Sequence, residues 1–323
     1  MHSLFHLETF NTNGIRMRAA VAGSGPLIVM VHGWPELWYS WRHQIGPLAK
    51  AGYKVAAIDV RGYGGSDKPY EIRAYDMQTM MADIIGVIDH FGADQAILIG
   101  HDWGAPICWN TAALFPERVS TVSGLSVPYR KRATISFPAL WEIFYKDRFF
   151  YQRYFQKEGV AEAELERDVG VSLRKFYYAI SGDAPNMDHW KNRDLDGGLL
   201  EGMPDPDPFP DWLTKDDLDY LTTEFTAGGF RGPLNRYRNQ TVDFDELPQM
   251  GVPPIHQPSC FIAGSDDLVR NLIPGHDGYV DPSENCTDMR VCKIIAGKGH
   301  WIQQEAPDRV TDALLGFLRN LRN

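Results

Sequence analysis

The sequence predicts an α/β fold in which a mostly parallel central sheet is flanked by helices and interrupted by one mainly helical insertion. Short apolar runs rich in β-branched residues are the first sign, because such runs suit strands buried on both faces of a parallel sheet. They lie at residues 26–31, 55–59, 96–99, 119–125, 259–263 and 291–295. Apolar residues with helical spacing separate the first runs, and this alternation of strand and helix is typical of a doubly wound sheet.

Two helices are expected between the early strands. They cover residues 38–48 and 77–91, and Gly92 ends the second as a C-terminal cap. After residue 125 the alternation stops until residue 259, and aromatic-rich helical stretches replace it. The expected helices of this insertion are Ala139–Phe155, Glu162–Ile180 and Lys215–Phe225, the last following a Thr214 N-cap.

The insertion divides the chain into two expected domains. A core domain is formed by residues 1–128 and 248–323, and a helical domain by residues 129–247. An amphipathic helix around residues 310–321 ends the core domain. At 323 residues, the chain is long enough for both.

Composition and charge exclude several classes of partner. A formal net charge of -10 disfavours nucleic acids and anionic membranes, and no apolar stretch is long enough to span a bilayer. The N-terminus lacks the pattern of a secretory signal, so a cytoplasmic location is expected. The four cysteines have neither metal-ligand spacing nor the density of a disulfide scaffold, so we expect reduced thiols.

The segment Gly100-His-Asp-Trp-Gly104 follows an expected strand and precedes an expected helix, which is the context of a nucleophile elbow. Glycines suit such a tight turn, and the central residue, Asp102, is then held out above the sheet. A carboxylate needs no deprotonation at neutral pH and suits displacement at a saturated carbon, so the elbow predicts alkyl transfer to Asp102. The alternative is a glycine-rich turn in which Asp102 only caps the helix. His101 should point away from Asp102, because side chains alternate along a strand.

The partners of Asp102 are expected after later strands, in the order nucleophile, acid, histidine. His300 follows the last expected strand, and Asp266 and Asp267 follow the one before it. One of these two aspartates should orient the imidazole. Hydrolysis of an ester on Asp102 also needs two donors for the developing oxyanion, and the backbone N–H groups of Trp34 and Trp103 can supply them.

Several motifs over nearly the whole chain resemble those of the epoxide hydrolases of the α/β-hydrolase fold. They are His32-Gly-Trp-Pro-Glu36, Gly100-His-Asp-Trp-Gly104, Tyr151-Gln-Arg-Tyr-Phe-Gln156, Pro210-Asp-Trp-Leu-Thr214, Gly232-Pro-Leu-Asn-Arg-Tyr-Arg-Asn239 and Gly299-His-Trp-Ile302. The resemblance implies that the insertion is a cap, or lid, which follows the sixth strand and covers the active site.

The resemblance also assigns individual residues. It implies that Tyr151 and Tyr237 hold the epoxide oxygen, with Tyr154 as the nearest rival to Tyr151, and it favours Asp267 over Asp266 as the acid. One departure is Arg236, where the family commonly has an aromatic residue. The implied reaction converts a small apolar epoxide and water to a vicinal diol through an ester on Asp102, without cofactor or metal. The protein is expected to be a monomer or homodimer.

Two other functions remain open. Haloalkane dehalogenases also have an aspartate followed by tryptophan at the elbow, but they commonly have asparagine where this chain has Trp34. A ligand-binding protein that kept the fold without turnover is the second alternative. The paired cap tyrosines and the complete catalytic set favour the epoxide hydrolase over both.

Overall fold

The computed structural model describes residues 5–184 and 193–321. Within these ranges eight strands form one sheet in the order β1-β2-β4-β3-β5-β6-β7-β8. The pairs β1/β2 and β2/β4 are antiparallel, and every other neighbouring pair is parallel. The mostly parallel α/β sheet predicted from the sequence is therefore confirmed.

Six strands match the apolar runs of the sequence. They are β3 (Leu27–Val31), β4 (Lys54–Ile58), β5 (Ala96–His101), β6 (Val119–Leu125), β7 (Ser259–Gly264) and β8 (Met289–Ile295). The sequence analysis missed β1 (His6–Thr12) and β2 (Ile15–Gly23). Both carry charged residues among the apolar ones, because β1 lies at the edge of the sheet and leaves several side chains exposed.

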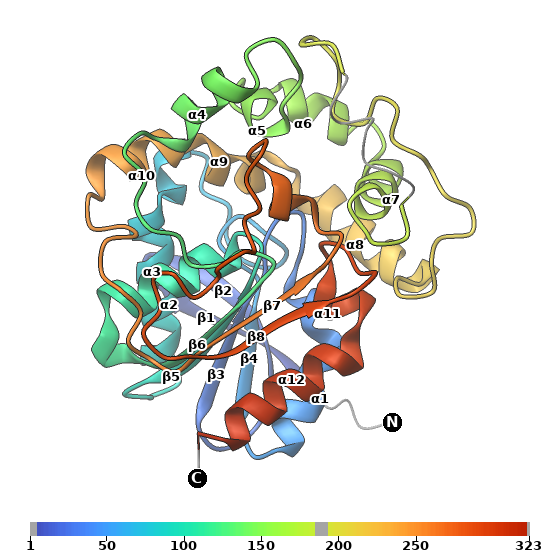
Figure 1. Cartoon of the computed structure of the whole chain (residues 1–323). Helices are drawn as coiled ribbons and strands as arrows, with labels where there is room; N and C mark the ends of the chain where they lie inside the picture. Colours follow the sequence, from blue (N-terminus) through green and yellow to red (C-terminus); the bar gives the residue numbers. More distant parts are fainter. Residues whose placement is uncertain (1–4, 185–192, 322–323) are drawn as a thin grey trace.

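Helices cover both faces of the sheet (Figure 1). One face of β3 packs through Ile28 and Met30 with α1 (Arg42–Lys50) and α12 (Pro307–Arg319). The other face packs with α2 (Met77–His90) and α3 (Gly104–Leu114). A strand buried on both sides is continuously apolar, which explains why these strands were visible in the sequence.

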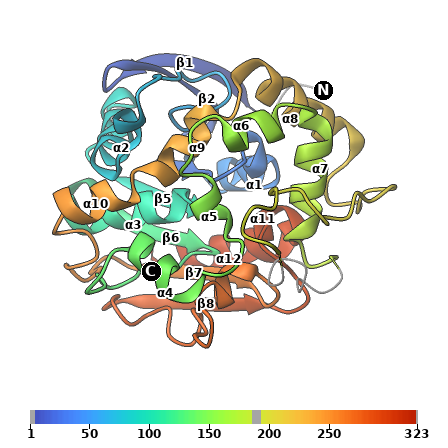
Figure 2. The ribbon, with the colours of Figure 1, turned by 90° about the horizontal axis from the view of Figure 1, so that it is seen from above.

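The insertion between β6 and β7 is helical, as predicted. It contains α4 (Phe137–Phe144), α5 (Tyr151–Tyr154), α6 (Val160–Leu165), α7 (Val169–Ala179), α8 (Lys215–Gly228), α9 (Arg231–Arg238) and α10 (Gln240–Glu246). These helices lie over one end of the sheet, and Figure 2 looks down on them. The Thr214 N-cap of α8 is confirmed by a capping box with Asp217.

Two long helices expected in the insertion were wrong, because each is divided in two. The expected helix Ala139–Phe155 is interrupted between α4 and α5, where Phe149 and Phe150 are both buried. Adjacent residues on a helix point about 100° apart, whereas the non-helical segment lets both rings pack inward. The expected helix Glu162–Ile180 is divided at Asp168, which caps α7 by accepting from the Val171 N–H.

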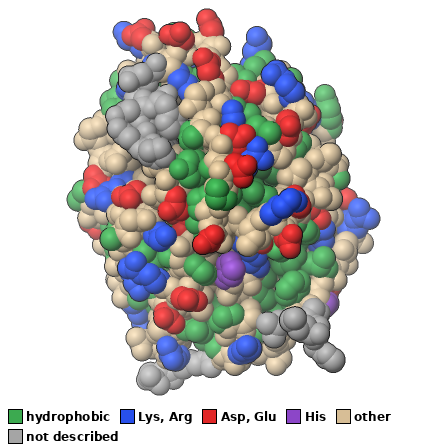
Figure 3. Space-filling model, turned by 90° about the vertical axis from the view of Figure 1, so that its right-hand side faces the viewer, with side chains coloured by type: hydrophobic (Ala, Val, Ile, Leu, Met, Phe, Trp, Pro, Cys, Tyr) green, Lys and Arg blue, Asp and Glu red, His purple; other side chains and the backbone are tan. Residues whose placement is uncertain are grey.

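The surface, the hydropathy of the helices and the cysteines bear on the expected partners. Basic and acidic side chains are interspersed over the face shown in Figure 3. No helix among the described residues has the length and hydropathy to cross a bilayer. Cys108, Cys260, Cys286 and Cys292 all lie within the described ranges and are free thiols, as predicted.

Candidate active site

The elbow forms where β5 runs into α3. Asp102 has φ of +48°, a left-handed conformation that few residues other than glycine adopt. The flanking glycines allow it: a Cβ on Gly104 would lie 2.0 Å from the Val31 carbonyl oxygen, and one on Gly100 would lie 2.2 Å from the Gly104 oxygen. The strained turn places the Asp102 side chain beyond the carboxyl end of the strand, as the sequence predicted.

Two groups of the core domain hold the Asp102 carboxylate. The Trp34 N–H donates to Oδ1 at 2.8 Å, and the His300 Nε2 lies 3.4 Å from Oδ2. A Cβ at Gly33 would lie 2.3 Å from Oδ1, so only glycine lets the β3 loop approach so closely. The Trp34–Pro35 peptide bond in this loop is cis. Trp103 follows Asp102 directly, at the N-terminal end of α3.

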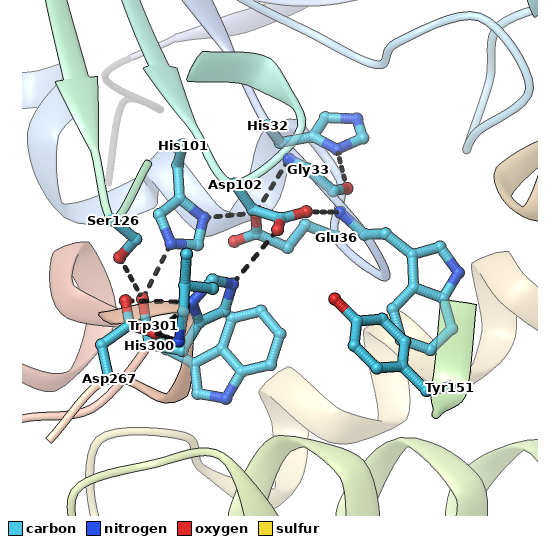
Figure 4. A network of polar contacts seen from close by, with 12 residues as sticks. His32, Gly33, Glu36, His101, Asp102, Ser126, Tyr151, Asp267, His300 and Trp301 are labelled. Atoms are coloured by element: carbon cyan, nitrogen blue, oxygen red, sulfur yellow. Dashed lines mark hydrogen bonds and ion pairs between the residues drawn. The ribbon is translucent and has the colours of Figure 1, made fainter. Parts of the chain in front are cut away.

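His300 lies between two carboxylates. Its Nδ1 is 3.0 Å from Asp267 Oδ1 and its Nε2 faces Asp102, and the histidine side chain is only 3% exposed (Figure 4). Burial alone would lower the pKa of His300, but Asp267 and Asp102 raise it well above its ordinary value. Burial likewise opposes ionisation of Asp267, yet His300 holds the pKa of Asp267 below its usual range.

The structure separates the two candidate acids. Asp267 is buried, accepts from the Val269 N–H at 2.9 Å, and lies 2.9 Å from the Tyr279 hydroxyl. Asp266 is exposed and accepts from the neighbouring Ser265 hydroxyl. Only Asp267 therefore reaches the imidazole. The sequence analysis missed Tyr279, which lies on a long loop before β8 without a motif to mark it.

A buried network behind Asp102 was also missed. His101 turns away from the nucleophile, as predicted, and its Nδ1 lies 2.6 Å from Glu36 Oε2 while its Nε2 lies 2.8 Å from the His300 carbonyl oxygen. The ring of His101 therefore joins the Glu36 side chain to the main chain of the loop that carries His300. Although burial alone would raise it, His101 lowers the pKa of Glu36 to about 2.

The contact between His101 and Glu36 ties three loops together. Glu36 also accepts from the Gly33 N–H at 2.9 Å and from the Gln303 side chain at 2.8 Å. The Ser126 hydroxyl donates to the same His300 carbonyl at 2.9 Å. The network therefore fixes the main chain on both sides of the Asp102 carboxylate (Figure 4). Glu36 lies within the motif that begins at His32, which is the one signal that pointed to it.

Tyr151 and Tyr237 face the site from the lid. Their ring centres are 6.0 Å apart, and the Tyr151 hydroxyl, which accepts from Gln152 at 2.7 Å, points toward the side of Asp102 (Figure 4). Burial raises the pKa of both phenols well above the ordinary value, and the Asp102 charge adds to the effect. Tyr154, the rival to Tyr151, instead donates to Glu164 at 2.9 Å.

Arg236, the residue that departs from the family pattern, is not one of the reacting groups, but it lies next to Trp103. Its guanidinium is 4.8 Å from the centre of the Trp103 ring and is fully buried. It donates to the Tyr75 carbonyl and pairs with Asp243. Asp243 in turn accepts from the Met77 N–H at 2.7 Å, so the pair fastens α9 and α10 to the start of α2.

Two cavities meet at the reacting groups, and both are lined by Asp102 and Tyr151. One is about 330 Å³ and extends between α3, α4, α10 and the loop after Val269. The other is about 20 Å³ and is lined by Trp34, Phe176, Ile180, Tyr237, Leu268 and His300 besides the shared residues. Among the described residues no group of three or more His, Cys, Asp or Glu side chains could hold a metal ion.

The fold and this site define the class of protein. Residues 26–307 match the family model described as alpha/beta hydrolase fold. Epoxide hydrolase A of Mycobacterium tuberculosis is 40% identical over 96% of both chains. Epoxide hydrolase 2 of Siraitia grosvenorii is 34% identical, covering 96% of this chain and 97% of its own.

Solved structures give the same result. Epoxide hydrolase A from Mycobacterium thermoresistibile superposes with a TM-score of 0.91 at 41% identity, covering 98% of each chain. An epoxide hydrolase from an endophytic Streptomyces reaches a TM-score of 0.93 at 41% identity, covering 100% of this chain and 97% of that one. The chain belongs to the epoxide hydrolase family of the α/β-hydrolase fold, as the motifs in its sequence indicated.

Proposed function

We propose that this protein converts epoxides to vicinal diols through a covalent ester on Asp102. One observation carries the proposal: the elbow carboxylate lies within 3.4 Å of a histidine that is itself held by a second carboxylate, and lid phenols close the same cavity. A base beside a carboxylate nucleophile suits a two-step reaction in which the first product is an ester.

The first step is alkylation of Asp102. A carboxylate oxygen attacks one epoxide carbon, the C–O bond of the ring breaks, and the oxygen takes a proton from Tyr151 or Tyr237. The raised pKa of these phenols keeps them protonated until the alkoxide develops. The product is a hydroxyalkyl ester of Asp102.

The second step is hydrolysis of the ester. His300, oriented by Asp267, takes a proton from water, and the hydroxide adds to the ester carbonyl carbon. Charge on the carbonyl oxygen is stabilised by the N–H groups of Trp34 and Trp103. The bond to the alkyl oxygen then breaks, and the diol leaves with a proton from the His300 imidazolium. The carboxylic acid left on Asp102 gives its proton to His300, and the carboxylate returns.

Alkylation itself prepares His300 to act as a base. In the free protein two carboxylates raise the pKa of His300, so that its ring holds a proton. Esterification removes the charge of Asp102, and the pKa of His300 therefore falls. The His300 proton can then pass to the tyrosinate that the first step leaves, and the neutral imidazole is the base for the second step.

A single turnover in heavy-oxygen water tests the ester. Water attacks the carbonyl carbon of the ester, so the label should enter Asp102 and be absent from the first diol. Mass analysis of the peptide that contains Asp102 measures this. Label in the diol with none in the peptide would refute the covalent route.

His300→Gln separates the two steps. The variant should be alkylated but not hydrolysed, and intact mass should show the protein heavier by one substrate molecule. Asp102→Ala is the matched control and should take up nothing. A turnover of His300→Gln equal to that of the unaltered protein would show that another group activates water.

Several finer expectations belong to the same proposal. We propose a small apolar epoxide as substrate, a cytoplasmic location, and a monomer or homodimer that binds no nucleic acid. The apolar lining of the larger cavity supports an apolar substrate, and the negative net charge of the protein disfavours nucleic acid. Halide release from haloalkanes at rates above epoxide turnover would favour the dehalogenase alternative.

A further inference from the structure

We infer that the residues described by the structure form one substrate-binding arm at the active site, so that the protein selects epoxides substituted on one side of the ring, with an apolar substituent on one carbon and only hydrogen on the other. The inference rests on the proposed function and deepens it by naming the substrate class. It follows from the unequal cavities that meet at Asp102.

The larger cavity is built to receive an apolar group. Its volume of about 330 Å³ is within the range of ordinary small-molecule sites. Beyond Asp102 and Tyr151 its wall includes Pro106, Phe137, Leu140, Phe244 and Leu272. Basic residues, Arg130 and Lys131 among them, lie along its lining and are exposed, so this arm reaches solvent.

The smaller cavity is about 20 Å³, which is room for about one water molecule. Phe176 fills much of this side: its ring meets that of Trp34 at 4.5 Å with an interplanar angle of 80°, and it is only 4% exposed. Ile180 closes the end of α7 and is 3% exposed. An alkyl chain or a phenyl ring does not fit here.

This wall has little freedom to withdraw. The Ile180 carbonyl accepts from the His300 N–H at 3.0 Å, which ties the end of α7 to the catalytic loop. A Cβ on Gly299 would lie 2.4 Å from the Gly182 nitrogen, so the two segments are already at backbone contact. Trp301, stacked on Tyr177 at 4.3 Å, packs behind them.

The small cavity has a use that competes with any substituent. It is lined by Asp102, Trp34 and His300, which are the groups between which water must add to the ester. A substituent placed here would displace that water and stop the second step. The requirements of the two steps are therefore compatible. The larger cavity receives the substituent, and the smaller one receives the water that hydrolyses the ester.

Two isomers of one formula test the inference, namely 1,2-epoxydecane and trans-5,6-epoxydecane. They have the same atoms and nearly the same hydrophobicity, but the second must place a four-carbon chain on each side of the ring. We expect kcat/KM to be at least about 100-fold higher for 1,2-epoxydecane, since even a single misfitting methylene changes this ratio about 10- to 200-fold. Equal values, or a preference for the trans isomer, would overturn the single-arm site.

Variants identify the wall that causes the preference. Phe176→Ala should lower the ratio of the two kcat/KM values by about tenfold or more, because it opens the small side. Leu140→Ala, the matched control in the larger arm, should not lower it. Leu268→Ala repeats the test on the small side if Phe176→Ala does not fold. A folded variant at either position that leaves the ratio unchanged would contradict the inference.

The same experiment distinguishes failure of the inference from failure of the function. If neither isomer gives a diol or an adduct on Asp102, the proposed function is wrong, and the single-arm assignment falls with it. If both isomers react equally, epoxide hydrolysis stands and only the single-arm assignment is refuted.

Discussion

The two sides of the active site are held by different forces. On the core side, Asp102, Asp267 and His300 are each fixed by hydrogen bonds to the main chain or to one another. On the lid side, Tyr237 is positioned by ring contacts with Trp34, Trp103 and Phe155 at 5.0–5.9 Å. Buried charged groups need several polar partners, whereas a neutral phenol needs a partner only for its hydroxyl, as Gln152 is for Tyr151, and its ring is placed by packing.

This difference matches two tasks: the core side carries out the chemical steps, and the lid side admits the substrate. The core side must keep charged atoms within a few tenths of an ångström through two chemical steps, and main-chain partners do so with little freedom. The lid side must admit a substrate and release a product, which ring packing allows without breaking strong polar contacts. The predictions below challenge this division, beginning with the largest effect.

Removing the charge on the core side should abolish turnover. Asp102→Ala deletes the nucleophile, and we expect kcat to fall by more than about 10,000-fold, because the other groups cannot replace a missing nucleophile. Diol formation under saturating substrate measures the effect. Substantial residual turnover would mean that water opens the epoxide directly.

Arg236 does not fit this division, since it is a buried charge on the lid side. Arg236→Met leaves Asp243 unpaired, and we expect the free energy of unfolding to fall by about 3–5 kcal/mol, measured by chemical denaturation. Arg236→Met combined with Asp243→Asn should recover most of the loss, because the buried charge is gone and an acceptor for the Met77 N–H remains. Arg73→Met, at an exposed ion pair with Glu246, is the control and should change little. No loss in Arg236→Met would show that the pair with Asp243 does not stabilise the position of α9.

The lid phenols should matter for chemistry rather than for folding. Tyr151→Phe and Tyr237→Phe keep the ring packing, so we expect the alkylation rate to fall about 10- to 100-fold with little change in Tm. Pre-steady-state protein fluorescence measures the rate. Tyr154→Phe is the matched control and should leave alkylation nearly unchanged, because its hydroxyl bonds Glu164. An equal effect in all three variants would point to packing.

The smallest effect is a difference in pH dependence between the two steps. Alkylation uses an ionised Asp102 and tolerates a protonated His300, so its rate should vary little near neutrality. Hydrolysis needs neutral His300, so its rate should fall about tenfold per pH unit once the pH is below the pKa of His300 in the ester. Single-turnover traces across pH separate the steps. A hydrolysis rate that rises as pH falls would contradict the role of His300.

The sequence predicted the core side better than the lid side. Asp102, His300 and the pair Asp266 and Asp267 each follow an apolar strand, and the carboxyl ends of parallel strands bring such residues together. The choice of Asp267, and Tyr151 and Tyr237 on the lid, came from the resemblance. The break between α4 and α5 depends on which aromatic rings are buried together, and no periodicity encodes this. The break before α7 follows from the Asp168 N-cap.

Other features could not be predicted because they depend on contacts between residues far apart in the sequence or on exposure to solvent. The contact between His101 and Glu36 joins residues 65 positions apart, so no local pattern in the sequence pairs them. The antiparallel strands β1 and β2 have mixed polarity because one of them borders solvent. The unequal cavities depend on how Phe176 meets Trp34, which is a fact of packing rather than of spacing.

We expect only one of the two carboxylate oxygens of Asp102 to be exchanged during turnover. Oδ1 is pinned by the Trp34 N–H, while Oδ2 faces His300. If Oδ2 forms the ester, it departs with the diol, and the oxygen that replaces it arrives from the side of His300 and takes the same place. Each diol would then carry an atom that entered the protein one cycle earlier, while Oδ1 would remain the original atom through every cycle. The two oxygens of a carboxylate are chemically equivalent, but in this site one would stay in the protein and the other would be replaced in every cycle.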